Sequence, residues 1–235
     1  MSPKRAKSAT TPFIYLHGGG YTNPIITHHW RLIAALAHEN SWTVTVPMYA
    51  LAPESDATDA LTRLTAVHQA VARNAPAAPV LGGDSAGGGL ALALAQRLRD
   101  ERLPGPRHLV LFAPWLDITL SNPAIAAIQR FDPTLSLPGL RHGGLLWANG
   151  CDPRDPAVSP LYADPANLCP TTVFVGTHDL LLPDCRAFAV KARAKGTDVA
   201  LYEFPGAFHV FVAGTFLPES RVARRLLTKR IVSSA

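Results

Sequence analysis

The sequence has few cysteines, few charged residues and no long apolar run. It holds three cysteines in 235 residues, and charged side chains make up 17% of the chain. Cys151, Cys169 and Cys185 include no C-x-x-C pair, and their odd number fits neither a disulfide framework nor a zinc site, so we expect idle thiols and no metal. No stretch reaches the roughly 18 apolar residues that a membrane-spanning helix needs. The first residues also lack the apolar centre of a secretory signal. These absences favour a cytoplasmic protein without stable membrane insertion.

The net charge of +5 comes largely from the two ends of the sequence, at positions 4–7 and 221–230. These basic residues are not interleaved with aromatic ones, and no nucleic-acid-reading motif is present. No G-K-[ST] loop and no G-x-G-x-x-G with a following acidic residue supports nucleotide binding. We therefore expect no nucleic-acid partner. Residues 1–12 are expected to form a basic, flexible tail.

Short aliphatic runs alternate with helical periodicity along the chain, which is typical of a parallel sheet wrapped by helices. The length and the 48% hydrophobic content favour one globular domain, here residues 13–235. Strands are expected at 13–16, 42–48, 80–82, 108–112, 171–175 and 199–204. Helices are expected at 30–38, 57–73, 86–99, 184–195 and 219–231. The segment 121–170 is rich in proline and small residues and predicts an excursion over the sheet, with one helix near 140–147.

The pentapeptide Gly83-Asp84-Ser85-Ala86-Gly87 matches G-x-S-x-G where a predicted strand gives way to a predicted helix. Such a sharp turn strains the backbone of the serine and exposes its hydroxyl at a helix N-terminus, where the dipole favours negative charge. A glycine-rich turn with a serine N-cap gives the same letters, so the motif alone leaves both interpretations open. Its context predicts Ser85 as a nucleophile.

The segment His17-Gly18-Gly19-Gly20 follows the first predicted strand, and its glycines leave backbone N–H groups uncovered. Acyl transfer needs such donors, because the carbonyl oxygen becomes negative in the tetrahedral intermediate. The expected oxyanion donors are the amides of Gly19, Gly20 and Ala86. Their neighbours His17, Gly18 and Asp84 are predicted to contact the substrate.

A serine nucleophile needs a base, and nine histidines compete for that role. His209 lies just after the last predicted strand, where the third member belongs in the chain order Ser, Asp, His. Asp179 is the first carboxylate after the preceding strand and would accept the Nδ1 proton of His209. Asp184 is the alternative acid, but it falls at the start of the next predicted helix and is interpreted as an N-cap.

Taken in order, these segments resemble the hormone-sensitive-lipase-like branch of the α/β-hydrolases, which includes the bacterial family IV esterases. The resemblance runs from Phe13 to the C-terminus, and its joint motifs are more specific than any one of them. They are H-G-G-G at 17–20, Y-A-L-A-P-E at 49–54 for the family's Y-R-L-A-P-E, G-D-S-A-G-G at 83–88, P-W-L-D at 114–117 and S-P-L at 159–161. The resemblance implies the α/β-hydrolase fold, a mostly parallel sheet flanked by helices.

Two departures from the family bear on the substrate. Family members usually carry some tens of residues before the oxyanion motif, forming the first two strands and the helices that cap the site, whereas here the motif begins at His17. We therefore expect the N-terminal cap and first strands to be missing. Three explanations are open: the site is unusually open, the natural protein has an N-terminal segment upstream of this sequence, or a partner chain covers the site. The strand at 13–16 would then lie closer to the sheet edge, which favours a homodimer through that edge. Ala50 replaces the usual arginine and weakens a structural ion pair.

The leading hypothesis is a serine carboxylesterase acting on small-molecule esters with short or medium acyl chains through an acyl-enzyme, without a cofactor. The same constellation serves amide or lactone hydrolysis, because fold and triad do not determine the leaving group. The alternative from another class is a non-catalytic small-molecule-binding protein on the hydrolase scaffold, like the plant gibberellin receptors, which have lost the histidine.

Overall fold

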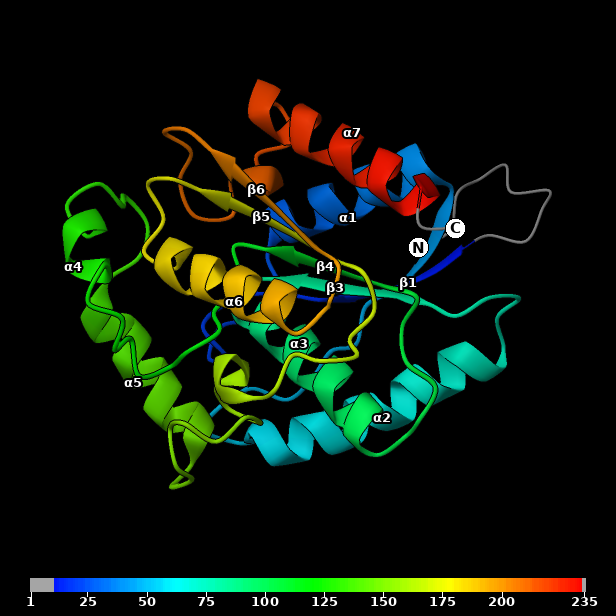
Figure 1. Cartoon of the computed structure of the whole chain (residues 1–235), viewed down its shortest axis with the longest axis horizontal. Coiled ribbons are helices and arrows are strands. Elements are labelled where there is room, and N and C mark those ends of the chain that lie inside the picture. Colours follow the sequence, from blue (N-terminus) through cyan, green and yellow to red (C-terminus); the bar gives the residue numbers. More distant parts are fainter. Residues whose placement is uncertain (1–10, 234–235) are drawn as a thin grey trace.

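Six parallel strands form one sheet in the order β2-β1-β3-β4-β5-β6 in the computed structural model, which describes residues 11–233 (Figure 1). The strands are β1 (Thr11–Leu16), β2 (Trp42–Thr45), β3 (Val80–Asp84), β4 (His108–Phe112), β5 (Thr171–Gly176) and β6 (Val199–Phe204). The helices are α1 (Thr27–Asn40), α2 (Ala57–Arg73), α3 (Ser85–Asp100), α4 (Ile125–Ile128), α5 (Leu137–Ala148), α6 (Leu182–Ala194) and α7 (Pro218–Ser233). Two short 3-10 helices, η1 (Pro160–Tyr162) and η2 (Phe211–Ala213), complete the elements.

Helices cover both faces of the sheet, α1 and α7 on one and α3 and α6 on the other, with α2 packed outside α3 (Figure 1). Successive side chains of a strand point to opposite faces, so β1 contributes Phe13 and Tyr15 to the core under α1 and α7. Ile14 and Leu16 point the other way, into the core under α3. Burial on both faces explains why the central strands β3, β4 and β5, which are buried at every position, do not alternate apolar and polar residues, whereas β2 at the edge does.

Each expected strand and helix is confirmed, with differences at the ends. The strand expected at 42–48 ends at Thr45, because β1 pairs with β2 only from Thr11 to Ile14 and Pro47 has no N–H to donate. The helix expected near 140–147 begins earlier, at Leu137, where the Ser136 side chain accepts the Gly139 amide. The short helix α4 was not expected.

The N-terminal boundary also differs from expectation. Thr11 and Pro12, assigned from the sequence to the flexible tail, are the first residues of β1 and pair in register with Trp42 and Thr43. The rest of that predicted tail, residues 1–10, and the predicted domain's last two residues lie outside the described residues. β1 lies between β2 and β3, one strand in from the edge, and the edge strands are β2 and β6. The homodimer through a sheet edge stays a prediction. No helix within 11–233 is long and apolar enough to cross a membrane.

Candidate active site

The predicted nucleophile, acid and base lie beyond the carboxyl ends of three parallel strands. Ser85 follows β3 directly, Asp179 lies three residues after β5, and His209 lies in the loop after β6. The carboxyl ends of parallel strands meet at one edge of the sheet, which is where open α/β sheets bind their ligands. The sheet thus brings together side chains that are far apart in the sequence.

Ser85 occupies the strained turn that its motif predicts. Its φ angle is 52°, in the left-handed region that side chains rarely adopt, and it is the first residue of α3. The turn is tight because α3 passes directly over the end of β1. A Cβ atom on Gly87 would lie 2.2 Å from the Leu16 carbonyl oxygen, so only glycine permits this approach.

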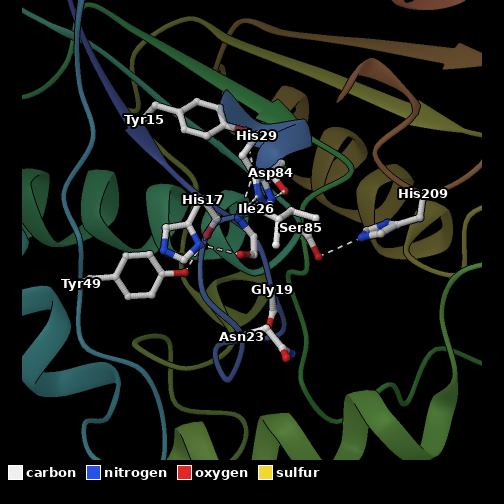
Figure 2. Close-up of polar contacts among 11 residues, drawn as sticks. Tyr15, His17, Gly19, Asn23, Ile26, His29, Tyr49, Asp84, Ser85 and His209 are labelled. Atoms are coloured by element: carbon white, nitrogen blue, oxygen red, sulfur yellow. Dashed lines mark hydrogen bonds and ion pairs between the residues drawn. The ribbon is translucent and has the colours of Figure 1, made fainter. Parts of the chain in front are cut away.

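His209 links Ser85 to Asp179. Its Nε2 lies 2.9 Å from the Ser85 Oγ (Figure 2), and its Nδ1 lies 2.9 Å from Oδ2 of Asp179. Asp179 is fully buried, and its other oxygen accepts the Leu181 amide at 2.9 Å. An ionised carboxylate can only accept, so Nδ1 carries the proton and Nε2 is free to accept one from the serine hydroxyl.

The electrostatic surroundings of His209 favour its role as a base that becomes charged during a reaction. Burial alone would lower its pKa, but the negative charge of Asp179 and the hydrogen bond to it hold the pKa above the ordinary value. Asp132 and Asp84 add to this effect at longer range. An imidazolium formed at this position is therefore stabilised.

Asp184, the alternative acid, lies elsewhere. Its Oδ1 accepts the Asn122 amide at 2.9 Å, and its Oδ2 has no partner among the described residues. Burial and the nearby charge of Asp117 raise the pKa of Asp184 to about 6. The hydrogen bond from Asn122 acts in the opposite direction but is the weaker effect. Its interpretation as an N-cap was wrong, because α6 begins at Leu182 and its N-cap residue is Leu181.

A cavity of about 610 Å³ opens beside Ser85 and His209. Gly19 and Gly20, two of the predicted oxyanion donors, line it. Ala86 is the second residue of α3, so its amide is one of the four at a helix start that have no partner within the helix. Much of the remaining wall is apolar, formed by Ile26, Leu135, Leu140, Phe208, Val210 and Phe216.

The residues predicted to contact the substrate divide into two groups. Asp84 lines the cavity. His17 and Gly18 are not among its lining residues: His17 is buried, stacks on the Tyr49 ring at 4.6 Å, and donates from Nδ1 to the Gly18 carbonyl at 2.7 Å (Figure 2). The structure therefore places these two behind the cavity wall.

His29 is a cavity residue that the sequence does not single out. It lines the cavity, and its Nε2 lies 3.2 Å from Oδ2 of Asp84. The sequence carries no signal for this contact, since 55 residues separate the two and His29 lies just before the helix expected at 30–38. Among residues 11–233 no group of three or more His, Cys, Asp or Glu is arranged to hold a metal ion.

Comparison with known proteins places the chain among hydrolases. The sequence profile of a family described as alpha/beta hydrolase fold matches residues 13–213. An esterase of Acinetobacter venetianus is 33% identical, over 94% of this chain and 74% of the relative. An acetyl-hydrolase of Streptomyces hygroscopicus is also 33% identical, over 95% of this chain and 75% of the relative.

Solved structures of an esterase/lipase and of a hormone-sensitive lipase are also similar to this chain. A hormone-sensitive lipase from a metagenome library has a TM-score of 0.91 and 31% identity, over 96% of this chain and 78% of that one. An esterase/lipase from an uncultured bacterium has a TM-score of 0.90 and 28% identity, over 97% of this chain and 78% of that one. The chain thus spans about three quarters of the length of these proteins.

Proposed function

The chain belongs to the hormone-sensitive-lipase-like branch of the alpha/beta hydrolase family and is a carboxylesterase, and we propose that it hydrolyses esters through Ser85, His209 and Asp179. The observation that carries this assignment is the continuous hydrogen-bonded chain from the Ser85 Oγ through both nitrogens of His209 to Asp179. A nucleophile, a base in contact with it and a group that orients the base are what activation of a serine requires.

In the proposed reaction the Ser85 Oγ attacks the ester carbonyl carbon while His209 Nε2 takes the hydroxyl proton. The carbonyl oxygen becomes negative and is stabilised by the amides of Gly19, Gly20 and Ala86. The intermediate collapses, the alcohol leaves with the proton from His209, and an acyl-enzyme remains. His209 then takes a proton from water, whose oxygen attacks the acyl carbon. The second intermediate releases the carboxylic acid and returns the proton to Ser85.

We further propose substrates with a short or medium acyl chain. The wall of the cavity offers apolar contacts from Ile26, Leu135 and Phe208, which suit a hydrocarbon chain, while its 610 Å³ must also hold the alcohol part. p-Nitrophenyl acetate, butyrate and octanoate are therefore expected to react with a higher kcat/KM than the palmitate. Equal or better use of palmitate would contradict this range.

Steady-state hydrolysis of p-nitrophenyl butyrate by the native chain and by Ser85→Ala tests the assignment. Removal of a nucleophile of this kind lowers kcat by about 10⁶-fold in a comparable hydrolase, so activity should fall to background. Ser121→Ala is a matched control, because that hydroxyl is bonded to Asp117 outside the cavity. Equal activity in Ser85→Ala and the native chain would refute the proposal.

A further inference from the structure

The carboxylate of Asp84, the residue before Ser85, is bonded to three donors. The Tyr15 hydroxyl donates to Oδ1 at 2.5 Å and the Gly18 amide to the same oxygen at 3.0 Å. His29 Nε2 lies 3.2 Å from Oδ2 (Figure 2). Burial alone would raise the pKa of Asp84, but its bonds to His29, Tyr15 and Gly18 hold the pKa below the ordinary value. Asp84 is thus a buried anion that binds donors from separate segments.

Both ring nitrogens of His29 are occupied. Its Nδ1 lies 3.0 Å from the amide nitrogen of Ile26, the N-cap residue of α1. A backbone amide can only donate, so Nδ1 is unprotonated and Nε2 carries the proton that faces Asp84. This is the reciprocal half of a capping box, with a histidine in place of the usual glutamate or glutamine. With neither nitrogen free for substrate, His29 is not an acid or base of the reaction.

These contacts hold the oxyanion loop, residues 17–26, at both of its ends. Near the start of the loop the Gly18 amide bonds directly to Asp84, and at the end Ile26 is joined to the same carboxylate through His29. The start is closely packed, since a Cβ on Gly18 would lie 2.3 Å from Oδ2 of Asp84. Gly19 and Gly20 lie between the two anchored ends.

The same carboxylate is joined to the nucleophile through the backbone. Asp84 ends β3, Ser85 begins α3, and the proposed third donor, Ala86, comes next. The Asp84–His29 pair therefore connects the segment that supplies two oxyanion donors with the segment that supplies the nucleophile and the third donor. Tyr21, within the loop, also stacks on Trp147 of α5 at 4.2 Å and on Trp115 at 5.5 Å, and the Trp115 amide donates to the Ser85 carbonyl, so the loop has further contacts besides those to Asp84.

We propose that His29 is a positioning residue of the oxyanion hole, which joins the end of the oxyanion loop to Asp84 and so sets where the Gly19 and Gly20 amides lie relative to the Ser85 Oγ. This inference rests on the proposed function of Ser85. Oxyanion donors act through their placement at the developing charge, so loss of the link lowers the rate of the chemical step more than substrate binding.

Three substitutions at His29 separate its two contacts. His29→Ala removes both. The His29→Asn amide oxygen can take the place of Nδ1 and keep the Ile26 bond, whereas the His29→Gln amide nitrogen reaches the place of Nε2 and keeps the Asp84 bond. The matched control is His38→Ala, an exposed histidine near the other end of α1. For each variant kcat and KM for p-nitrophenyl butyrate are measured, with the inhibition constant of an aryl trifluoromethyl ketone and the melting temperature.

A trifluoromethyl ketone forms a tetrahedral adduct with the serine, so its affinity reports the oxyanion hole directly. We expect His29→Ala to lower kcat by about 10- to 100-fold with KM within about threefold, and to weaken the ketone by a similar factor. His29→Asn and His29→Gln should fall between His29→Ala and the native chain, and His38→Ala should match the native chain.

A purely structural role would lower the melting temperature of His29→Ala while kcat and ketone affinity of the folded variant stay native, and that result overturns the proposal. Ser85→Ala in the same assay separates this failure from a failure of the proposed function. Activity that survives Ser85→Ala refutes the function itself. An inactive Ser85→Ala beside a fully active His29→Ala refutes the positioning role alone.

Discussion

The carboxylate of Asp132 accepts the backbone N–H of Leu180 at 2.8 Å, one residue beyond Asp179. Its other oxygen accepts the amides of Thr134 and Leu135, at 2.8 and 2.9 Å, and both of those residues line the cavity. Asp132 thus ties a wall of the cavity to the loop that carries the proposed acid. Its negative charge also reaches His209, where it adds to those of Asp179 and Asp84.

Asp132→Asn should move the acidic limb of the pH profile of kcat/KM to lower pH. His209 must be neutral to accept a proton, so activity is lost as pH falls through its pKa. The Asp132 charge helps hold that pKa above its ordinary value, and its removal lowers the pKa. Asn keeps one carbonyl oxygen as an acceptor. The control is Asp152→Asn, because Asp152 is exposed and its carboxylate accepts the backbone amide of Arg154, two residues further along the same turn. If the pH profile of kcat/KM is the same for Asp132→Asn as for Asp152→Asn, the Asp132 charge does not act on His209.

Asp179→Asn and Asp184→Asn separate the two acids that the sequence leaves open. The Asp179 carboxylate lies 2.9 Å from Nδ1 of His209. The amide of Asn at position 179 can hold His209 in the wrong tautomer, so kcat should fall by about 10⁴-fold. Asp184 bonds to Asn122 instead, so Asp184→Asn should keep kcat within about threefold of the native value. Rates of p-nitrophenyl butyrate hydrolysis decide this, and a larger loss for Asp184→Asn would reverse the assignment.

Asp184 should make the protein less stable as pH rises. Burial raises its pKa from the ordinary 3.8 to about 6, so the folded state keeps a proton that the unfolded state has lost. Its stabilising effect is complete below about pH 4 and declines up to about pH 6, by up to about 3 kcal/mol over that span.

Urea unfolding of the native chain and of Asp184→Asn at a series of pH values measures this effect. The neutral amide does not titrate, so the variant should gain stability relative to the native chain between pH 4 and 6, and the difference should stay constant above that range. A difference that does not change with pH would mean that the carboxyl group has an ordinary pKa in the folded protein.

The order of strands and helices could be predicted because burial on both faces leaves a direct trace in the sequence. The strand 108–112 is His108 followed by four apolar residues, and the structure has it with the same bounds. The end of β2 could not be predicted as well, since residues 46–48 remain apolar although β2 pairs with β1 only as far as Thr45. The strand ends where its pairing with β1 ends, and Pro47 lacks the N–H that a further ladder bond would need.

Some residues of the candidate site could likewise be predicted from the sequence, and others could not. Ser85, Asp179 and His209 could be selected because each follows a strand, and the parallel topology brings strand ends together. His29 and Asp132 could not, because their partners Asp84 and Leu180 are 55 and 48 residues away and no local pattern records such contacts. The burial of His17 was also hidden, since its stacking on Tyr49 depends on the path of the chain between β2 and α2.

Covalent labelling of Ser85 tests the central claim most directly. Diethyl p-nitrophenyl phosphate transfers its phosphoryl group to an activated serine and releases p-nitrophenolate, and the product does not turn over readily. Mass spectrometry of the digested protein should show one diethyl phosphate on the peptide that contains Ser85, none in Ser85→Ala, and slow labelling in His209→Ala. Rapid labelling of another residue, with Ser85 unmodified and the esterase activity lost, would contradict the account.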